Sequence, residues 1–285
     1  MGLKIETWSI AYRKKKDGLI IDNTSDFKVI DNGHKGWYAD PFLFDYKGDT
    51  YLFAEYYSYD LGRGVIAFAI YDEHTDSFSE FKEIIREDYH LSYPLVFQGE
   101  DGQIYMMPES NQKEELYLYR AVSFPFKWKK EKIIMNGIKV VDTTPFQYKN
   151  SYYAFSLKLK DQLLLLSFKD CNFEEPEIQF VTDDMSYARP GGHVCVWDEN
   201  RIFVSQDCSD EYGKAVNLLN FKLTDDKNHP VEFSLLKKLT AEQVGLINGK
   251  PGSGIHTYNF SEKLEVIDIK YYRNSYYRLL KRLFK

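Results

Sequence analysis

Charged and aromatic side chains stand at one repeated position in this sequence, beside the start of a short apolar run. Asp40, Tyr93 and Asp142 hold this position in three segments, and Arg189 and His256 hold it in two later ones. Carboxyl groups can protonate a leaving group, activate water or attack an anomeric carbon, and aromatic rings pack on the apolar faces of sugars. If the fold brings these side chains together, they could act on a glycosidic bond.

A second set of polar side chains follows the next β-rich run of each segment. This set consists of Glu55, Glu109, Ser156 with Lys158, Gln206 with Asp207, and Asp268 with Lys270. The simpler interpretation of any single position is structural, because an Asp before Pro often caps a turn. The functional interpretation depends on several of these side chains meeting at one place.

The segments repeat at a spacing of roughly 50 residues, which is typical of repeat architectures. Four of them begin near Pro41, Pro94, Pro145 and Pro190, and the fifth begins at His256. Each contains an apolar run, a polar turn and a second run rich in Tyr, Phe, Ile and Val, which predicts a β-hairpin. Further β-rich runs follow each hairpin, so the pattern predicts about four strands per unit.

Five such units predict an all-β fold, a five-bladed β-propeller. The N-terminal run 5–12 alternates but has no hairpin of its own, so we expect it to pair with the last unit and close the ring. A β-sandwich is the alternative, although it does not predict so regular a hairpin spacing. The first strand of a propeller blade lines the central channel, and a hairpin returns to the same rim. Both polar sets are therefore expected around one opening.

Composition excludes several classes of protein. The 285 residues include 43 acidic and 37 basic ones, and the net charge of −6 argues against a nucleic-acid binder. The 23 Tyr, 20 Phe and 4 Trp can support a large core. No run is apolar for long enough to span a membrane, and the N-terminus lacks a secretory signal. The 3 cysteines form no metal or disulfide pattern, so we expect a reduced, cytoplasmic protein.

The run 37–42, followed by Gly48 and the run 51–53, resembles the first blade of the five-bladed propeller glycosidases. These families include arabinanases, β-xylosidases, invertases and levansucrases. The resemblance implies that Asp40 is the general base or the nucleophile. It also implies that Asp142 stabilises the transition state or modulates a pKa.

The same resemblance extends to other candidate residues. His256 is similar to a fifth-blade histidine near the axis of the arabinanase-like enzymes. The third catalytic residue, the general acid, has its best counterpart in Glu109, with Glu55 and Asp207 as alternatives. The expected substrate-binding residues are Trp37, Glu55, Tyr93, Thr144, Arg189, Gln206, Asp207, Tyr212 and His256.

A resemblance that covers nearly the whole chain is to the N-terminal domain of glucosamine inositolphosphorylceramide transferase and to its bacterial relatives from surface-polysaccharide loci. Five motifs recur in order, in the runs 39–44, 90–94, 107–110, 188–192 and 205–213. In the plant protein the propeller lies beside a separate glycosyltransferase domain. The resemblance therefore implies glycan synthesis and a glycosyltransferase as a partner.

Together these patterns favour a glycan-active enzyme, which transfers or hydrolyses glycosyl groups in surface-polysaccharide or glycolipid biosynthesis. The alternative is a non-catalytic carbohydrate-binding or scaffolding propeller that partners a glycosyltransferase. The sequence has no His-rich metal motif and no Gly-rich phosphate loop before a helix. We therefore expect no metal and no cofactor, with an axial calcium ion as the alternative.

Residues 1–270 are expected to form a single propeller domain, and residues 271–285 a basic C-terminal tail. Leu279, Leu280, Leu283 and Phe284 have helical spacing, with basic residues between them. A basic amphipathic helix predicts attachment to an anionic membrane surface, here the inner face, and packing against the last blade is the alternative. The expected substrate is a carbohydrate or an activated sugar, and the tail would suit a lipid-linked one.

Overall fold

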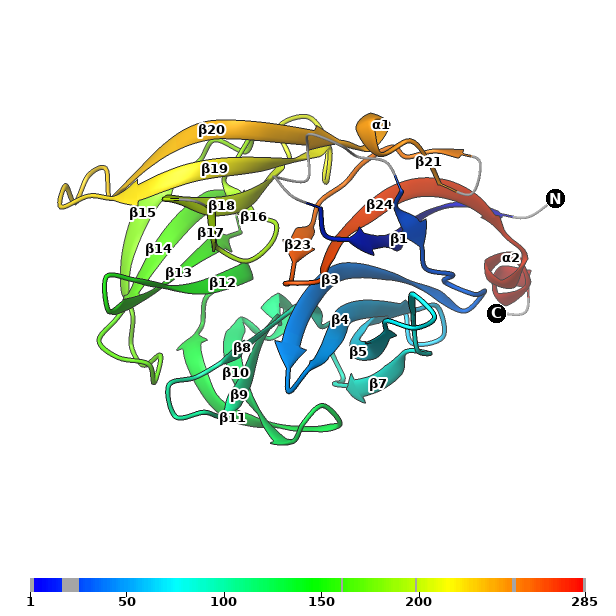
Figure 1. Ribbon diagram of the computed structural model, residues 1–285, viewed down its shortest axis with the longest axis horizontal. Coiled ribbons are helices and arrows are strands. Elements are labelled where there is room, and N and C mark those ends of the chain that lie inside the picture. Colours follow the sequence, from blue (N-terminus) through cyan, green and yellow to red (C-terminus); the bar gives the residue numbers. More distant parts are fainter. Residues whose placement is uncertain (1–2, 17–25, 160, 198, 248–249, 284–285) are drawn as a thin grey trace.

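Five antiparallel sheets stand in a ring around a central axis and form a five-bladed β-propeller (Figure 1). The structure is a computed structural model, which describes residues 3–16, 26–159, 161–197, 199–247 and 250–283. The predicted fold class and the predicted blades of about four strands are confirmed.

Three blades follow the chain from the axis outward. The first contains β3 (Gly36–Tyr46), β4 (Asp49–Ser58) and β5 (Arg63–Asp72), with β6 (Ser77–Phe78) and β7 (Lys82–Ile85) both paired to β5. The second contains β8 (Ser92–Gln98), β9 (Ile104–Glu109), the 3-10 turn η2 (Asn111–Lys113), β10 (Glu115–Ser123) and β11 (Lys127–Asn136). The third contains β12 (Val140–Tyr148), β13 (Ser151–Lys158), β14 (Gln162–Phe168) and β15 (Glu177–Thr182).

The fourth blade has a divided inner strand. It contains β16 (Arg189–Pro190) and β17 (Cys195–Trp197), which both pair with β18 (Asn200–Asp207), and then β19 (Ala215–Leu223) and β20 (Val231–Thr240). A short helix, α1 (Ala241–Val244), and a small hairpin of β21 (Leu246–Ile247) and β22 (Lys250–Pro251) lead to the last blade.

The fifth blade joins the two ends of the chain. It contains β23 (Tyr258–Phe260), β24 (Leu264–Ser275), β1 (Leu3–Lys14) and β2 (Lys28–Val29). The register runs without interruption from Leu3 opposite Ser275 to Lys14 opposite Leu264, so the N-terminal strand closes the ring as expected. The strand β24 continues past residue 270 to Ser275, and helix α2 (Tyr276–Leu283) follows it. Among the described residues no helix is long and apolar enough to cross a membrane.

Each blade packs both faces against its neighbours, so its middle strands contain buried apolar runs. The run from Leu163 to Leu166 in β14 is buried for this reason. Between the third and fourth blades, Phe155 packs against the rings of Phe146, Phe203 and Phe221. Many aromatic residues of the sequence therefore pack in layers between the blades. The ends of the inner strands lie near the central axis.

Candidate functional site

Three inner strands share a β-bulge close to the start of the strand. The bulges lie between Ala39 and Phe42, between Ser92 and Leu95, and between Val141 and Thr144. The residue that each bulge places in the left-handed region is Asp40 (φ 49°), Tyr93 (φ 48°) or Asp142 (φ 53°). Positive φ is uncommon outside glycine, and bulges redirect side chains beside functional sites. The prolines at 41 and 94 lie within these register shifts, where a missing N–H breaks no ladder bond.

A cavity of about 360 Å³ lies where the inner strands begin. This volume falls within the range of small-molecule sites, about 300–1,000 Å³. Seven of the predicted site residues line the cavity: Trp37, Asp40, Glu55, Glu109, Arg189, Tyr212 and His256. They come from β3, β4, β9, the inner strand of the fourth blade, the loop after β18 and the segment before β23, so the cavity is shared by four blades.

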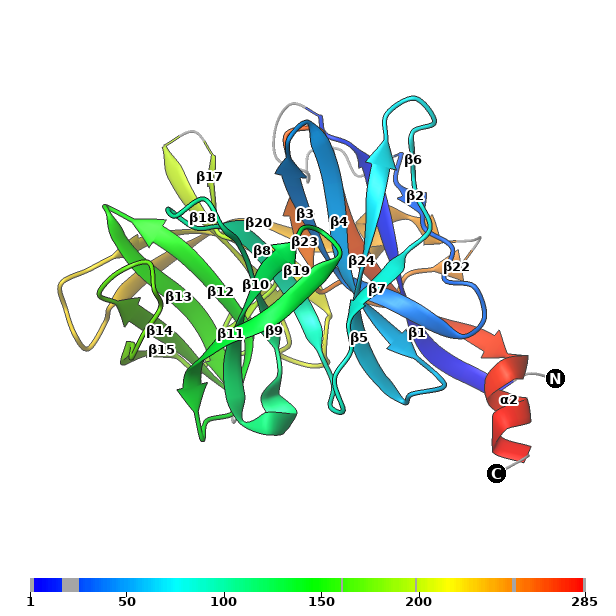
Figure 2. The same cartoon turned by 90° about the horizontal axis from the view of Figure 1, so that it is seen from below.

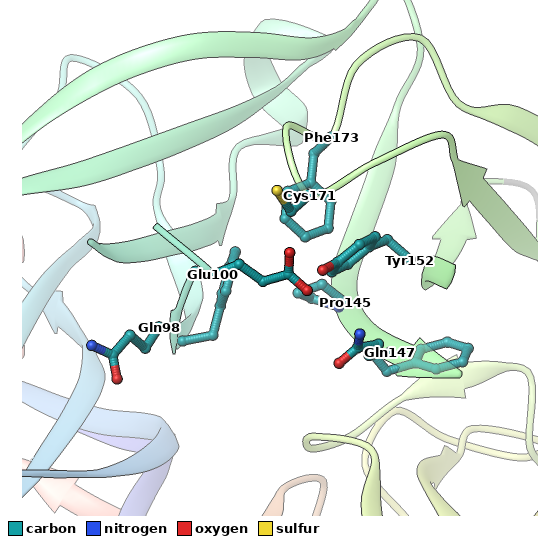
Figure 3. A pocket seen from close by; sticks show the side chains of 10 residues that line it. Gln98, Glu100, Pro145, Gln147, Tyr152, Cys171 and Phe173 are labelled. Carbon is teal, nitrogen blue, oxygen red and sulfur yellow. The ribbon is translucent and has the colours of Figure 1, made fainter. Parts of the chain in front are cut away.

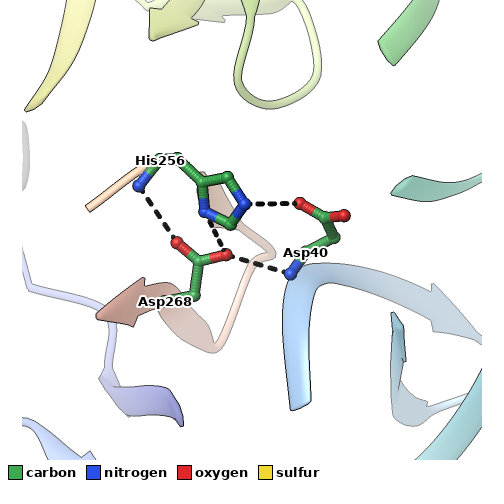
Figure 4. Close-up of side chains that lie close together, drawn as sticks. All are labelled: Asp40, His256 and Asp268. Carbon is green, nitrogen blue, oxygen red and sulfur yellow. Dashed lines mark hydrogen bonds and ion pairs between the residues drawn. The ribbon is translucent and has the colours of Figure 1, made fainter. Parts of the chain in front are cut away.

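Asp40 belongs to a closed group with His256 and Asp268 (Figure 4). His256 Nδ1 lies 2.7 Å from Asp268 Oδ2, and His256 Nε2 lies 3.3 Å from Asp40 Oδ1. The backbone N–H of Asp40 donates to Asp268 Oδ2 at 3.0 Å and closes the ring. Burial acts to lower the pKa of His256, but the two carboxylates outweigh it and raise that pKa. The two acids therefore favour the cationic form of the imidazole.

The pKa of Asp40 is raised to about 7, chiefly by burial, and His256 opposes this rise. The pKa of Asp268 is lowered, because burial is outweighed by His256 and by the hydrogen bonds that Asp268 accepts. Asp268 accepts the backbone N–H groups of His256 and Thr257 at 3.1 and 3.0 Å, and also the Thr257 hydroxyl. Asp268 is thus the acid of the group whose ionised form is favoured most strongly.

An axial calcium ion would need its protein ligands at this group. Asp40, His256 and Asp268 are the only His, Cys, Asp or Glu residues of the described chain that offer three ligand atoms within 4.8 Å of one another. Calcium takes six to eight oxygen ligands. Here the oxygens of Asp268 already accept hydrogen bonds from N–H and O–H donors, and His256 offers a nitrogen atom as its ligand. The donor set does not fit calcium.

Arg189 faces the cavity and Asp142 stands behind it. The Nε of Arg189 lies 2.6 Å from Asp142 Oδ2, and Gln206 Nε2 donates to the same oxygen at 3.1 Å. The guanidinium group also lies 4.7 Å above the ring of Tyr212. Asp142 was expected to point into the opening. It does not line the cavity, because Arg189 covers it.

Glu55 reaches the cavity from the end of β4. Its Oε1 lies 3.4 Å from Nε2 of His90, and a Cβ atom at Gly64 would come within 2.5 Å of that oxygen. His90 Nδ1 accepts the N–H of Gly64 at 3.0 Å, so the ring proton is on Nε2. Burial is the main cause that raises the pKa of Glu55 well above its usual range, and Asp40 and Glu109 add to it.

Glu109 lies at the end of β9 and is held by two donors. Its Oε2 accepts the hydroxyl of Ser92 at 2.5 Å, and its Oε1 accepts the N–H of Asn111 at 3.2 Å. Burial raises the pKa of Glu109, while Ser92, Arg189 and Asn111 act in the opposite direction. Asn111 belongs to η2, so this turn fixes the orientation of the carboxyl group.

Four other predicted binding residues lie outside the lining of the cavity. Tyr93 is fully buried, and its hydroxyl contacts Thr144 Oγ1 at 2.8 Å and accepts the N–H of Gly192 at 2.9 Å. Gln206 donates to Asp142 and, at 2.7 Å, to the carbonyl of Pro190. Asp207 forms an ion pair with Lys238 and accepts the hydroxyl of Ser209 at 2.6 Å. These side chains connect blades or loops.

Several lining residues were absent from the sequence-based set: Trp8, Tyr57, His90, Ser92, Asn111 and Gln112. Trp8 lies on the ring-closing strand β1 and stacks on His256 with ring centroids 3.9 Å apart. The prediction that residues 5–12 enter the last blade could have led to it. His90 and Ser92 belong to the motif 90–94, of which only Tyr93 was an expected binding residue.

A second cavity of about 200 Å³ lies between the second and third blades (Figure 3). It is lined by residues of β8 and the β8–β9 turn, of β12 and β13, and of the loop after β14, including Glu100, Gln147, Tyr152, Cys171 and Phe173. The hairpin turns lie at the rim opposite to the one where the inner strands begin. None of the predicted site residues lies in this cavity.

One protein family matches residues 25–262, and its description is glucosamine inositolphosphorylceramide transferase 1, N-terminal. The plant proteins named glucosamine inositolphosphorylceramide transferase 1 are similar in sequence. The identity is 34% over 212 residues for the protein from Arabidopsis thaliana and 32% over 210 residues for that from Oryza sativa subsp. indica. Each alignment covers 69% of this chain but only 27% and 28% of the plant proteins. The chain thus spans less than a third of their length.

Solved structures with the same fold are more distant in sequence. An α-L-arabinofuranosidase from Podospora anserina, solved in complex with cellotriose, has a TM-score of 0.57 at 12% identity and covers 85% of this chain and 92% of its own. A thermostable family-43 glycoside hydrolase has a TM-score of 0.55 at 12% identity, covering 83% and 89%. These similarities concern the propeller fold.

Proposed function

The chain belongs to the family of glucosamine inositolphosphorylceramide transferase 1 N-terminal domains, and we propose that it is a glycan-active enzyme. The cavity would bind a carbohydrate or an activated sugar. Its carboxyl groups would transfer or hydrolyse a glycosyl group in the synthesis of a surface polysaccharide or a glycolipid.

Two buried carboxyl oxygens carry this proposal, Asp40 Oδ1 and Glu55 Oε1. Both residues line the cavity, and neither oxygen has a well-aligned hydrogen bond from any described residue. A buried acceptor without a well-aligned hydrogen bond costs free energy, and the hydroxyl groups of a sugar would supply such bonds to both. Trp37 stacks on Tyr57 with ring centroids 4.8 Å apart, which gives the cavity an aromatic wall for the apolar face of a sugar.

The two carboxyl groups differ in what surrounds them, as acid–base chemistry requires. Asp40 is the proposed base or nucleophile, because His256 opposes the rise of its pKa and so favours its ionised form. Glu55 is the proposed general acid, because burial raises its pKa and no well-aligned hydrogen bond to its Oε1 favours the charged form. This proposal gives Glu55 the role that the resemblance suggested for Glu109. Asp142 does not line the cavity, so it would act on the substrate only indirectly, by holding Arg189 in position.

One contact favours the alternative of a non-catalytic carbohydrate-binding propeller. Asp40 Oδ2 accepts the backbone N–H of Tyr93 at 3.1 Å, so Asp40 also joins the first blade to the second. In that case a glycosyltransferase in a partner chain or a further domain would perform the chemistry. The proposed location for either function is the cytoplasmic face of a membrane.

Replacing Asp40 by Asn distinguishes these functions. The amide keeps the shape of the side chain but cannot act as a base or nucleophile, so Asp40→Asn should lower turnover by about a hundredfold or more. Turnover would be measured as hydrolysis of 4-nitrophenyl glycosides and as transfer from nucleotide sugars, first screened with the unmodified protein. Glu55→Gln should reduce turnover most for substrates with poor leaving groups, because these depend on the general acid.

The matched control is Asp49→Asn, at the far end of the same hairpin, where the side chain is exposed. This variant should keep full activity. An Asp40→Asn protein that has normal thermal unfolding and full activity would exclude the catalytic role of Asp40 and favour the binding function.

A further inference from the structure

His90 lines the cavity but has no part in the chemistry proposed above. It lies in the connection between β7 and β8, and its side chain is 24% exposed. Two hydrogen bonds hold it: the ring Nδ1 accepts the N–H of Gly64 at 3.0 Å, and the backbone N–H donates to Gln112 Oε1 at 3.0 Å. The other ring nitrogen, Nε2, faces Glu55, whose Oε1 lies 3.4 Å away.

The contact with Gly64 fixes the protonation of the His90 ring. A cationic imidazole carries a proton on both nitrogens, so its Nδ1 could not accept an N–H. Burial also lowers the pKa of His90, which favours the neutral ring. The single ring proton of His90 is therefore on Nε2, the nitrogen that faces the carboxyl group of Glu55.

The absence of a side chain at Gly64 allows this contact. A Cβ atom there would lie 2.5 Å from Glu55 Oε1 and 2.9 Å from His90 Cε1. Gly64 is also bound to the connection before β8, because its carbonyl accepts the N–H of Leu91 at 3.2 Å. The backbone of β5 thus holds the imidazole and the carboxyl group beside each other.

Ionisation of Glu55 is unfavourable in these surroundings. Burial is the largest cause that raises its pKa, and four other acids, from β3, β9, β24 and β12, act in the same direction: Asp40, Glu109, Asp268 and Asp142. Among the described basic side chains, His90 is the one in close contact with the Glu55 carboxyl group. A general acid becomes a carboxylate when it gives up its proton, so that state needs a stabilising contact.

We propose that His90 is a positioning residue for Glu55, and that its Nε2–H stabilises the carboxylate that Glu55 becomes during the reaction. The proton of the Glu55 carboxyl group passes to the leaving oxygen. The bond between this oxygen and the anomeric carbon breaks, and its electron pair stays on the oxygen. The negative charge remains on Glu55, and His90 neither gives nor takes a proton. This inference rests on the proposed function, in which Glu55 is the general acid.

The contact strengthens only as the charge develops. Beside the protonated carboxyl group, the His90 N–H lies 3.4 Å from an oxygen that has no well-aligned hydrogen bond. Beside the carboxylate, the same N–H forms a charge-assisted bond, which is shorter and roughly twice as strong. Interactions that are stronger in the transition state than before it accelerate the reaction. A cation in this place would instead keep Glu55 ionised from the start, so the neutral ring suits a general acid.

His90→Phe tests the inference, because it keeps a planar ring and removes the N–H. The pKa of Glu55 would be measured by NMR in full-length protein with ¹³C-labelled Glu carboxyl groups, and Glu55→Gln identifies the signal. Loss of the donor should raise this pKa by about 1. His90→Gln, whose amide can still donate, should restore most of the difference. The matched control is His74→Phe, an exposed position outside the cavity lining, which should leave this pKa unchanged.

Turnover supplies a second readout. His90→Phe should lower kcat about tenfold or more for glycosides with poor leaving groups, and less than about twofold for 4-nitrophenyl glycosides, whose departure needs little protonation. Activity requires protonated Glu55, so the alkaline limb of the pH profile should move to higher pH in His90→Phe. Equal losses for all leaving groups, with an unchanged limb and an unchanged Glu55 pKa, would show a structural role only. The inference would then be wrong, and the proposed function would remain.

If His90→Phe does not fold, ¹⁵N NMR of the unmodified protein decides the question. The His90 ring should be neutral with its proton on Nε2 from about pH 5 to pH 8. Its Nε2 signal should shift as Glu55 ionises, and Glu55→Gln should abolish that shift. A cationic ring or a proton on Nδ1 would overturn the inference. If Glu55→Gln lowers turnover equally for all leaving groups, the general acid of the proposed function is wrong, and the inference falls with it.

Discussion

At the scale of single residues, Asp40 both joins neighbouring blades and presents a carboxyl oxygen to the cavity. Its backbone N–H and its Oδ2 join neighbouring blades through Asp268 and Tyr93, which holds the residue in place. Its Oδ1 remains directed at His256 and the cavity (Figure 4). The positive φ of Asp40 makes both sets of contacts available, because the bulge turns the side chain away from the alternation of the strand.

The raised pKa of Asp40 predicts a pH dependence of stability. The folded-state pKa of about 7 exceeds the value of 3.8 expected for an unfolded chain, so the folded state binds more protons between these values. The contribution of this group is therefore complete below about pH 4 and is lost as the pH rises through about 7. Asp40→Asn cannot titrate. Its free energy of unfolding, relative to that of the unmodified protein, should increase from about pH 4 to pH 8.

Urea unfolding at a series of pH values checks this prediction. Asp49→Asn serves as the control, because its exposed side chain should leave the pH profile unchanged. Parallel curves for Asp40→Asn and the unmodified protein would show that the pKa of Asp40 is not raised in the folded state.

At the scale of elements, helix α2 follows the end of β24 and lies at the outer edge of the ring (Figure 1 and Figure 2). Arg273, just before the helix, donates to the carbonyls of Gly33 and Gly36 at 2.9 and 2.8 Å. The guanidinium group of Arg278 lies 5.1 Å above the ring of Tyr59. The ring centroid of Tyr59 lies 6.3 Å from that of Tyr57, which lines the cavity. The predicted tail thus begins as part of β24 and continues as a helix that contacts Tyr59, a neighbour of the cavity-lining Tyr57.

We propose that this tail attaches the protein to an anionic membrane, where the cavity would face lipid-linked glycans. Its sequence carries Arg278, Lys281, Arg282 and Lys285, and basic residues near an anionic surface each strengthen binding. A chain that ends at Ser275 should lose most of its sedimentation with phosphatidylserine vesicles. A full-length chain with Lys281→Glu and Arg282→Glu should lose it too, because the charge is reversed.

Both proteins should keep the thermal stability of the unmodified chain, since β24 remains complete. Equal sedimentation of the shortened and full-length chains would rule out attachment through the tail. Neutral phosphatidylcholine vesicles control for binding that does not depend on charge.

At the scale of the whole molecule, the pairing of β1 with β24 closes the ring between the two ends of the chain. The two strands also carry site residues. Trp8 on β1 stacks on His256, and Asp268 on β24 holds the imidazole. Closure of the propeller and assembly of the candidate site therefore depend on the same blade.

Ile10 tests how much the ring depends on β1. It is completely buried in a cluster with Leu43, Leu52 and Val266. Ile10→Ala should lower the free energy of unfolding by about 2–5 kcal/mol, because it leaves a cavity in a packed core. The unfolding curve should remain a single transition, since opening one blade exposes its neighbours.

The matched control is Ile178→Ala on β15, where the side chain is 49% exposed and the cost should be about 0.5 kcal/mol or less. Denaturant unfolding followed by tryptophan fluorescence and by circular dichroism checks both variants. Two separate transitions in the Ile10→Ala protein, only one of them shifted, would contradict the view that the ring unfolds as a unit.

The sequence alone determined the architecture, because strand alternation, polar turns and the repeat spacing are local properties. The hairpin turns, the ring-closing role of residues 5–12 and the placement of Asp40, Glu55, Glu109, Arg189 and His256 near one rim follow from that repeat. A local sequence pattern predicts which end of a strand a residue occupies. It does not predict how a β-bulge turns the side chain of that residue.

Only the tertiary structure decided which of these groups share the cavity and in what charge state. Asp40 meets Asp268 across 228 positions of sequence, and His90 reaches Glu55 from the connection between two blades. Asp142 and Asp40 held equivalent positions in the sequence pattern of their blades. Arg189 covers Asp142, whereas Asp40 lines the cavity beside His256. Burial and pairing depend on neighbours from other blades, and the physical state of each acid therefore emerges only when the ring is closed.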